Sequence, residues 1–202
     1  MNEDGTIALG PIIALEGAVG RVLAMVRAAT YGHRAGSKRL GDLTLKGGNL
    51  INAARSSKDE LRKLLASFEN VEEDLTETSV LAISAHFAEF LRLTLKLEGA
   101  ATLPDSVAGL EGLIGVAGAL KKVREEFPLF LLIAASSLRG GGLERKALEG
   151  YGSDEVELTF KSGKTLLYRE GDRIAMTGDQ LEHLGKAVVE AAKIIVNALS
   201  AR

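Results

Sequence analysis

Basic side chains gather between residues 34 and 62, and their types and spacing suit binding chemistry better than any other feature of the sequence. Four fall in a glycine-rich stretch that we expect to be a loop. Three follow at intervals of three and four residues on a predicted helix, in one stripe. A phosphate backbone is bound by charge more than by shape, so this arrangement suits RNA or single-stranded DNA. The predicted nucleic-acid-binding residues are Arg34, Lys38, Arg39, Lys46, Arg55, Lys58 and Arg62.

Charge is divided unevenly along the chain, and this division supports a second interpretation of the basic stretch. Residues 21–63 contain ten Lys or Arg against three acids, a net charge of +7, whereas residues 64–126 contain five against eleven, a net charge of −6. The basic side chains would then pair with the acidic segment, within one chain or between copies. The overall charge of −2 and the pI near 6.0 count against a dedicated nucleic-acid binder, and both interpretations stay open.

A phosphate-binding loop is the one cofactor motif that the sequence approaches. Residues 162–165 read Ser-Gly-Lys-Thr, like the end of a P-loop. That motif also requires glycine at position 158, which is Leu, and a helix after Thr165, where a strand is predicted. We interpret these residues as a hairpin turn.

Residues for nucleophilic or metal chemistry are scattered. His33, His86 and His183 have no partner at metal-ligand spacing, and the chain contains no Cys. Ser136 and Ser137 have no neighbouring base, and the Gly-x-Ser-x-Gly nucleophile motif is absent. We therefore predict a protein that is not an enzyme, with no catalytic residues, no metal site and no cofactor.

Helical periodicity covers most of the first 138 residues and must position the basic side chains. Helices are predicted at 12–29, 50–68, 76–97, 104–126 and 129–138. Residues 31–48 contain five glycines and are predicted as a break, in which 43–45 could form a short strand. Residues 91–97 alternate as a strand would, but the residues before them have helical spacing, which favours a helix.

Glycine placement suggests close helix packing. Gly17 and Gly20 lie in the first predicted helix, and glycine recurs at 109, 112, 115 and 118 in the fourth. Each interior glycine costs about 0.5–1 kcal/mol relative to Ala, so four of them predict a flat face against which another helix packs. The helix at 129–138 is apolar all round and is predicted to be buried.

The period changes to that of strands near residue 156. Alternating residues at 156–160, 166–168 and 173–176 predict a three-strand meander, and an amphipathic stripe predicts a last helix at 180–199. The predicted fold class is mainly α, a helical bundle with a small antiparallel β-meander at about 156–176 before the C-terminal helix. The expected domains are a bundle at 1–150, a meander at 151–179, and a helix at 180–202 that packs back on the bundle.

Composition bears on location and habitat. The start of the chain is acidic where a signal peptide is basic, and the apolar stretch 11–30 carries three charged residues, too many for a membrane span. We predict a cytoplasmic protein with no membrane partner. One Gln, five Asn, three Met and no Cys follow the depletion of thermolabile residues in hyperthermophile proteins, so we predict a thermophilic source.

Four features carry a resemblance to a known family: the predicted helices at 12–138 and 180–199, the meander, the basic stretch 34–62 and the thermophile-like composition. Together they resemble the helical small subunit of archaeal type I-A CRISPR interference complexes. The resemblance implies an antiviral-defence subunit that binds guide RNA–DNA or a displaced strand without catalysis.

A different class of function fits the same features. The glycine face at 109–118 and the opposed charge blocks could serve a structural protein that self-associates or docks on a larger protein, without nucleic acid. The expected partners are therefore RNA or single-stranded DNA in the first hypothesis, and protein or a second copy in the alternative.

Overall fold

The computed structural model describes residues 9–45, 71–99, 103–124, 126–138, 155–159, 165–169 and 176–201. These residues are mainly helical, as predicted. The helices are α1 (Gly10–Leu45), α4 (Val71–Leu95), α5 (Val107–Ile114), α6 (Glu126–Leu138) and α8 (Gly178–Ser200), and the strands are β1 (Glu155–Thr159) and β2 (Thr165–Arg169).

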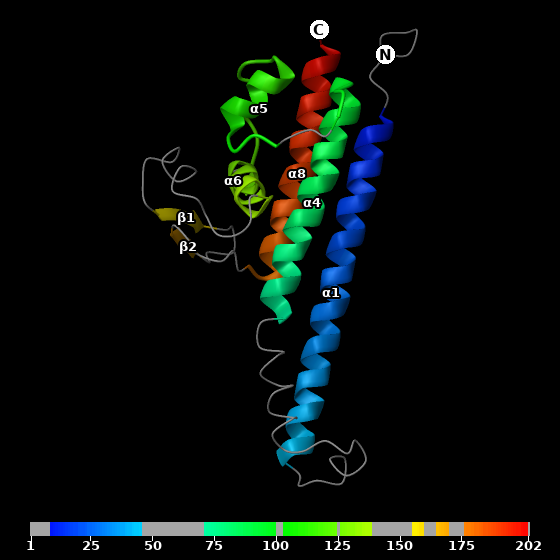
Figure 1. Ribbon diagram of the computed structural model, residues 1–202, viewed down its shortest axis with the longest axis vertical. Helices are drawn as coiled ribbons and strands as arrows, with labels where there is room; N and C mark the ends of the chain where they lie inside the picture. Colours follow the sequence, from blue (N-terminus) through cyan, green and yellow to red (C-terminus); the bar gives the residue numbers. More distant parts are fainter. Residues whose placement is uncertain are drawn as a thin grey trace.

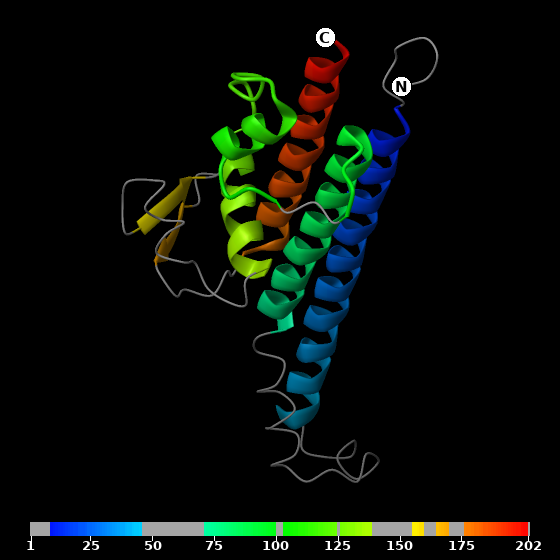
Figure 2. The same cartoon turned by 45° about the horizontal axis from the view of Figure 1, so that its top comes forward.

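The bundle has three layers (Figures 1 and 2). The middle layer is formed by α4 and α8, which contact each other. Both also contact α1 on one side and α6 on the other. The chain runs along α1 in the direction opposite to α4 and α8. One side of α1 therefore faces the bundle and the other is turned away from it.

Four phenylalanines fill the interface between α4 and α6. The ring of Phe87 on α4 meets those of Phe127 and Phe130 on α6 edge-on, with centroids 5.7 and 5.8 Å apart. Within each helix the rings stack, Phe87 on Phe90 at 5.8 Å and Phe127 on Phe130 at 6.1 Å. Such pairs add about 0.5–1.5 kcal/mol beyond the area they bury. Residues 129–134 are at most 2% exposed, which confirms the buried apolar helix over those residues.

The structure confirms the last helix that the amphipathic pattern predicts, as α8. Thr177 caps α8 in a reciprocal pair, since its hydroxyl accepts from the Gln180 backbone N–H and the Gln180 side chain accepts from the Thr177 backbone N–H. The predicted stripe lies against α1, α4 and α6, with these members buried: Leu181, Leu184, Val188, Ala191 and Ile195.

The predicted break after residue 30 is wrong within the described part of the chain. α1 continues without interruption to Leu45, so Gly32, Gly36 and Gly41 are helical and residues 43–45 are not a strand. A glycine in a helix interior costs about 0.5–1 kcal/mol, whereas a proline there costs about 3 kcal/mol or more, and no proline occurs in this part of the helix. Residues 46–70, including the helix predicted at 50–68, lie outside the described residues.

α5 and α4 each end just before a residue with positive φ, Gly115 and Lys96 respectively. α5 stops at Ile114 because Gly115 takes a φ of 67°, and Gly118 has a φ of 73°. The helix predicted to reach residue 126, with a flat glycine face at 109–118, is therefore wrong: two of its four glycines make turns. The helical interpretation of 91–97 holds as far as Leu95, and Lys96 takes a φ of 53°.

The two strands form one antiparallel hairpin, with Glu155 opposite Arg169 and Thr159 opposite Thr165. It lies on the α6 side of the bundle (Figure 2). Thr165 begins a strand, as expected if residues 162–165 are a turn and not a P-loop. Residues 173–175 of the predicted third strand lie outside the described residues, so the three-strand meander stays a prediction.

Candidate interaction surface on α1

The inner face of α1 explains why this helix joins the bundle. Leu15, Val19, Val22 and Val26 recur at intervals of three and four residues and are 2–8% exposed. They pack in the same core cluster as the buried residues of α4 and α8. Burying each such side chain stabilises the fold by about 1.5–3 kcal/mol before the cost of ordering it.

Two ion pairs set the register between α1 and α8. Glu16 accepts from the Lys193 Nζ at 3.3 Å, and Arg27 donates to Glu182. The two positions are eleven residues apart on each helix and run in opposite order, which is the signature of antiparallel packing. Between them Gly185 brings the backbones together, because a Cβ there would lie 3.0 Å from Val19 Cγ1.

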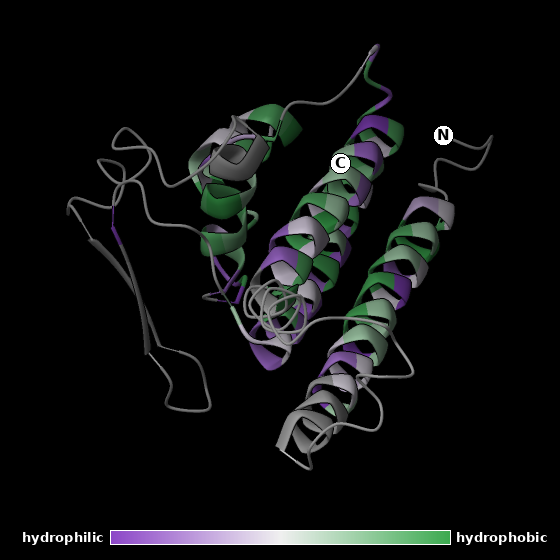
Figure 3. Ribbon diagram, turned by 60° about the horizontal axis from the view of Figure 1, so that its bottom comes forward, coloured by the Kyte–Doolittle hydropathy of each residue, from purple (hydrophilic) through white to green (hydrophobic). Residues whose placement is uncertain are grey.

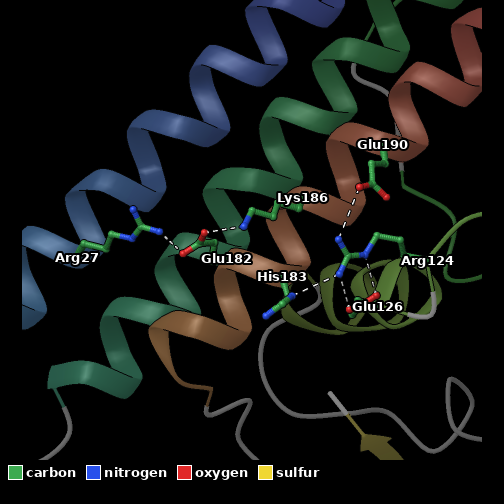
Figure 4. Close-up of polar contacts among 7 residues, drawn as sticks. All are labelled: Arg27, Arg124, Glu126, Glu182, His183, Lys186 and Glu190. Atoms are coloured by element: carbon green, nitrogen blue, oxygen red, sulfur yellow. Dashed lines mark hydrogen bonds and ion pairs between the residues drawn. The ribbon is translucent and has the colours of Figure 1, made fainter. Parts of the chain in front are cut away.

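The Glu182 carboxylate is the strongest electrostatic feature of this contact (Figure 4). It accepts a hydrogen bond from the Lys186 Nζ at 2.8 Å and another from Arg27. These two hydrogen bonds lower the pKa of Glu182 to about 2. The carboxylate is thus ionised throughout the neutral range and joins α1 to α8.

A second polar cluster lies on the other side of α8, toward α6. Arg124 donates to the Glu126 carboxylate at 2.9 and 3.2 Å, and its guanidinium lies 3.6 Å from Glu190 (Figure 4). Burial is the largest single influence on the pKa of Glu126 and raises it. The hydrogen bonds from Arg124, the backbone N–H of Glu126 and the nearby positive charge together outweigh burial, so the pKa is lowered. The same guanidinium lies 3.3 Å from His183 Nδ1, which accepts when unprotonated, because Arg has no acceptor. The cluster fastens the start of α6 to α8.

The opposite face of α1 differs from this charged and packed side. We call a row of exposed, uncharged residues on this side the outward face: Gly10, Ile13, Gly17, Gly20, Ala24, Ala28, Tyr31 and Ala35. Arg21 is exposed at its border, with a guanidinium nitrogen 3.4 Å from where a Cβ of Gly17 would lie. Ile13 is 66% and Tyr31 78% exposed. Figure 3 shows α1 as a mostly green-to-white ribbon interrupted by short purple segments. Solvent-facing helix surfaces are normally charged or polar, so this face is unusual.

Among the described residues, the glycines of the outward face make no close packing contact. A Cβ added at Gly10 or Gly20 would meet nothing within 4 Å, and one at Gly17 would meet only the Arg21 side chain at 3.4 Å. At Gly185 and Gly109, by contrast, a Cβ would come within 3.0 Å of another residue. The outward glycines therefore leave room for something beyond the described chain.

The predicted nucleic-acid-binding residues fall partly within this structure. Arg34 is exposed on α1, and Lys38 and Arg39 follow on the same helix instead of on a loop. Lys46, Arg55, Lys58 and Arg62 lie outside the described residues. The structure thus brings together three of the seven, on one rigid element.

Sequence reasoning missed the outward face. Its signal was available: between residues 10 and 36 the charged residues are Glu16, Arg21, Arg27 and Arg34, and none occurs at the positions of the outward face. The sequence places apolar residues on almost every side of this helix, and that pattern does not tell which side is covered. Finding the face required knowing which side of α1 meets α4 and α8.

Over the described part of the chain, no group of three or more His, Asp or Glu residues could hold a metal ion. The helices described here do not combine the length and apolar character that crossing a membrane requires. The chain matches no protein-family model, no curated protein and no solved structure.

Proposed function

We propose that this chain is a non-enzymatic interaction protein that docks through the outward face of α1, on another copy or on a larger protein. One observation carries the proposal: a long helix has an exposed row of uncharged residues that is rich in glycine, with open space at Gly10 and Gly20. Contiguous exposed apolar surface on a folded chain marks an interaction site.

The energetics of glycine support the same conclusion. Each helical glycine costs about 0.5–1 kcal/mol relative to Ala, and Gly17 and Gly20 receive no packing in return within the described chain. Small residues let two helix backbones approach closely, which recovers that cost in van der Waals contact once a partner is present. A solvated face would be served better by Ala, Lys or Glu.

The test is an assembly measurement on full-length protein in extracts of the source organism. We expect the wild type to migrate well above its 21.4 kDa mass by native size separation, and Ala24→Glu to shift it towards the monomer. Asn197→Glu, on the exposed side of α8, is the matched control and should migrate as wild type. Migration of all three as monomers would overturn the proposal.

A second measurement separates docking from folding. Gly20→Ala fills open space, so it should stabilise the isolated chain by about 0.5–1 kcal/mol in urea unfolding while weakening assembly. Gly109→Ala is the contrasting control, because its Cβ would lie 3.0 Å from Pro104 Cβ and should bring no such gain. Gly20→Ala that leaves assembly as tight as in the wild type contradicts close packing at this face.

Nucleic-acid binding is the second candidate function. What favours it is that α1 carries Arg34, Lys38 and Arg39 on one rigid helix. Under this proposal the chain is a cytoplasmic, thermophilic subunit like the CRISPR small subunits it resembles. Changing Lys38, Arg39 and Arg62 to Glu should abolish retention on single-stranded RNA or DNA at low salt. Unchanged retention would sink this candidate.

A further inference from the structure

We propose that the partner of the outward face is α1 of a second copy, packed antiparallel about a two-fold axis near residue 22. This inference rests on the proposed function and specifies its partner. Three properties of α1 lead to it: the order of side-chain sizes along the face, the charges at its edge, and the area it offers.

The sizes along the outward face are symmetric about its middle. Ile13 and Tyr31 each lie nine residues from position 22, while Gly20 and Ala24 each lie two residues from it. A two-fold axis there sets Ile13 against Tyr31 of the other copy and Gly20 against Ala24. The small residues meet at the crossing point, where the backbones approach most closely, and the large ones fill the space where the helices diverge. Such self-complementarity is what an isologous interface requires.

The charges at one edge of the face are arranged in the same way. Glu16 and Arg27 both lie on the edge that meets α8, since they pair with Lys193 and Glu182. In an antiparallel pair like edges meet, so Glu16 of one copy comes level, within one residue, with Arg27 of the other, twice by symmetry. Their side chains are 56% and 67% exposed and can take this further partner.

The antiparallel order is also favoured by the basic end of α1. Arg34, Lys38 and Arg39 lie toward its C-terminal end. A parallel pair would bring the two basic ends side by side, where like charges repel. An antiparallel pair places them at opposite ends of the dimer, about 36 to 51 Å apart at 1.5 Å per residue.

The area of the face indicates which class of complex it can form. From Leu9 to Ala35 the helix is about 40 Å long, and a strip about 10 Å wide buries roughly 400 Å² on each copy. The total of roughly 800 Å² lies below the about 1,200 Å² of stable complexes. We therefore expect a reversible dimer with a dissociation constant on the order of micromolar.

Sedimentation equilibrium of the purified full chain tests the stoichiometry. Between about 1 and 500 µM, a range that brackets micromolar affinity, the wild type should rise from 21.4 kDa toward twice that mass. Ala24→Glu should stay monomeric, and Asn197→Glu should behave as wild type. A wild type that stays monomeric throughout overturns the second-copy partner. If Ala24→Glu still disrupts the assembly in extracts, the proposed function stands.

Cross-linking tests the orientation, and the chain suits it because it contains no Cys. Gly10→Cys and Ala35→Cys lie at the two ends of the outward face, about 37 Å apart along one helix. With a bis-maleimide of about 15 Å reach, antiparallel packing should link the two variants when mixed and leave each one alone unlinked. Linking within each variant alone would show parallel packing, and no linking of a chain that sediments as a dimer would place the interface elsewhere. Either result overturns the inference.

Discussion

α1 and α8 are both long helices of one bundle, yet they use their surfaces differently. α8 places its apolar residues inside and its charges outside, and its cap and stripe are complete within the chain. α1 buries one side equally well but leaves apolar and small residues on the other. α8 has the pattern expected of a helix that only stabilises the fold, with apolar residues buried and charged residues exposed. α1 carries, in addition, an exposed row of small and apolar residues that the described fold does not use, and on this row the proposed docking function rests.

The largest expected effect on the free energy of unfolding tests the difference between the two faces of α1. Val26 is 2% exposed, so Val26→Glu buries an unpaired carboxylate and should destabilise the chain by about 3–5 kcal/mol. Ala24→Glu, two residues away on the outward face, should stay within about 0.5 kcal/mol of wild type. Urea unfolding of dilute, monomeric protein measures both. Equal losses would show that the outward face also serves the fold.

A smaller effect compares two glycines. Gly185→Leu forces side-chain atoms against Val19 and Leu23, and overpacking of this kind costs about 1–3 kcal/mol. Gly20→Leu enters open space and should not destabilise the monomer. The measurement is the thermal midpoint of each variant at low concentration. Val19→Ala should restore part of the loss in Gly185→Leu, because it removes the closest contact.

The smallest effect concerns pH and the ion pairs that join the two helices. The pKa of Glu182 is lowered to about 2 from an ordinary value of about 4.3. The carboxylate therefore stabilises the fold above about pH 4.3, and this contribution is lost as the pH falls toward 2. We expect Glu182→Gln to be less stable than wild type at pH 6, with a difference that shrinks on acidification. A constant difference between pH 6 and 2 would contradict the role of its charge.

Sequence reasoning worked where one local signal sufficed. The amphipathic stripe from Leu181 predicts α8, and the apolar run after Pro128 predicts a buried helix. Sequence reasoning failed where the contributions that favour a helix and those that oppose it are close in size. The glycines at 32, 36 and 41 weaken α1 without ending it, whereas Gly115 does end α5, and the sequence alone does not distinguish these outcomes. The outward face could not be predicted because exposure depends on which helices are neighbours.

The separation between the two faces of α1 has a consequence for how this protein can change over time. Substitutions at Gly20, Ala24 or Ala28 touch nothing that the bundle needs, so they are nearly neutral for folding. Substitutions at Val19 or Val26 are constrained by the core. Binding specificity can therefore drift, or be redesigned, on a scaffold whose stability stays fixed. Among homologues we expect the variability of positions along α1 to follow the helical period. The residues facing the core should be conserved, and those of the outward face should diverge wherever the partners differ.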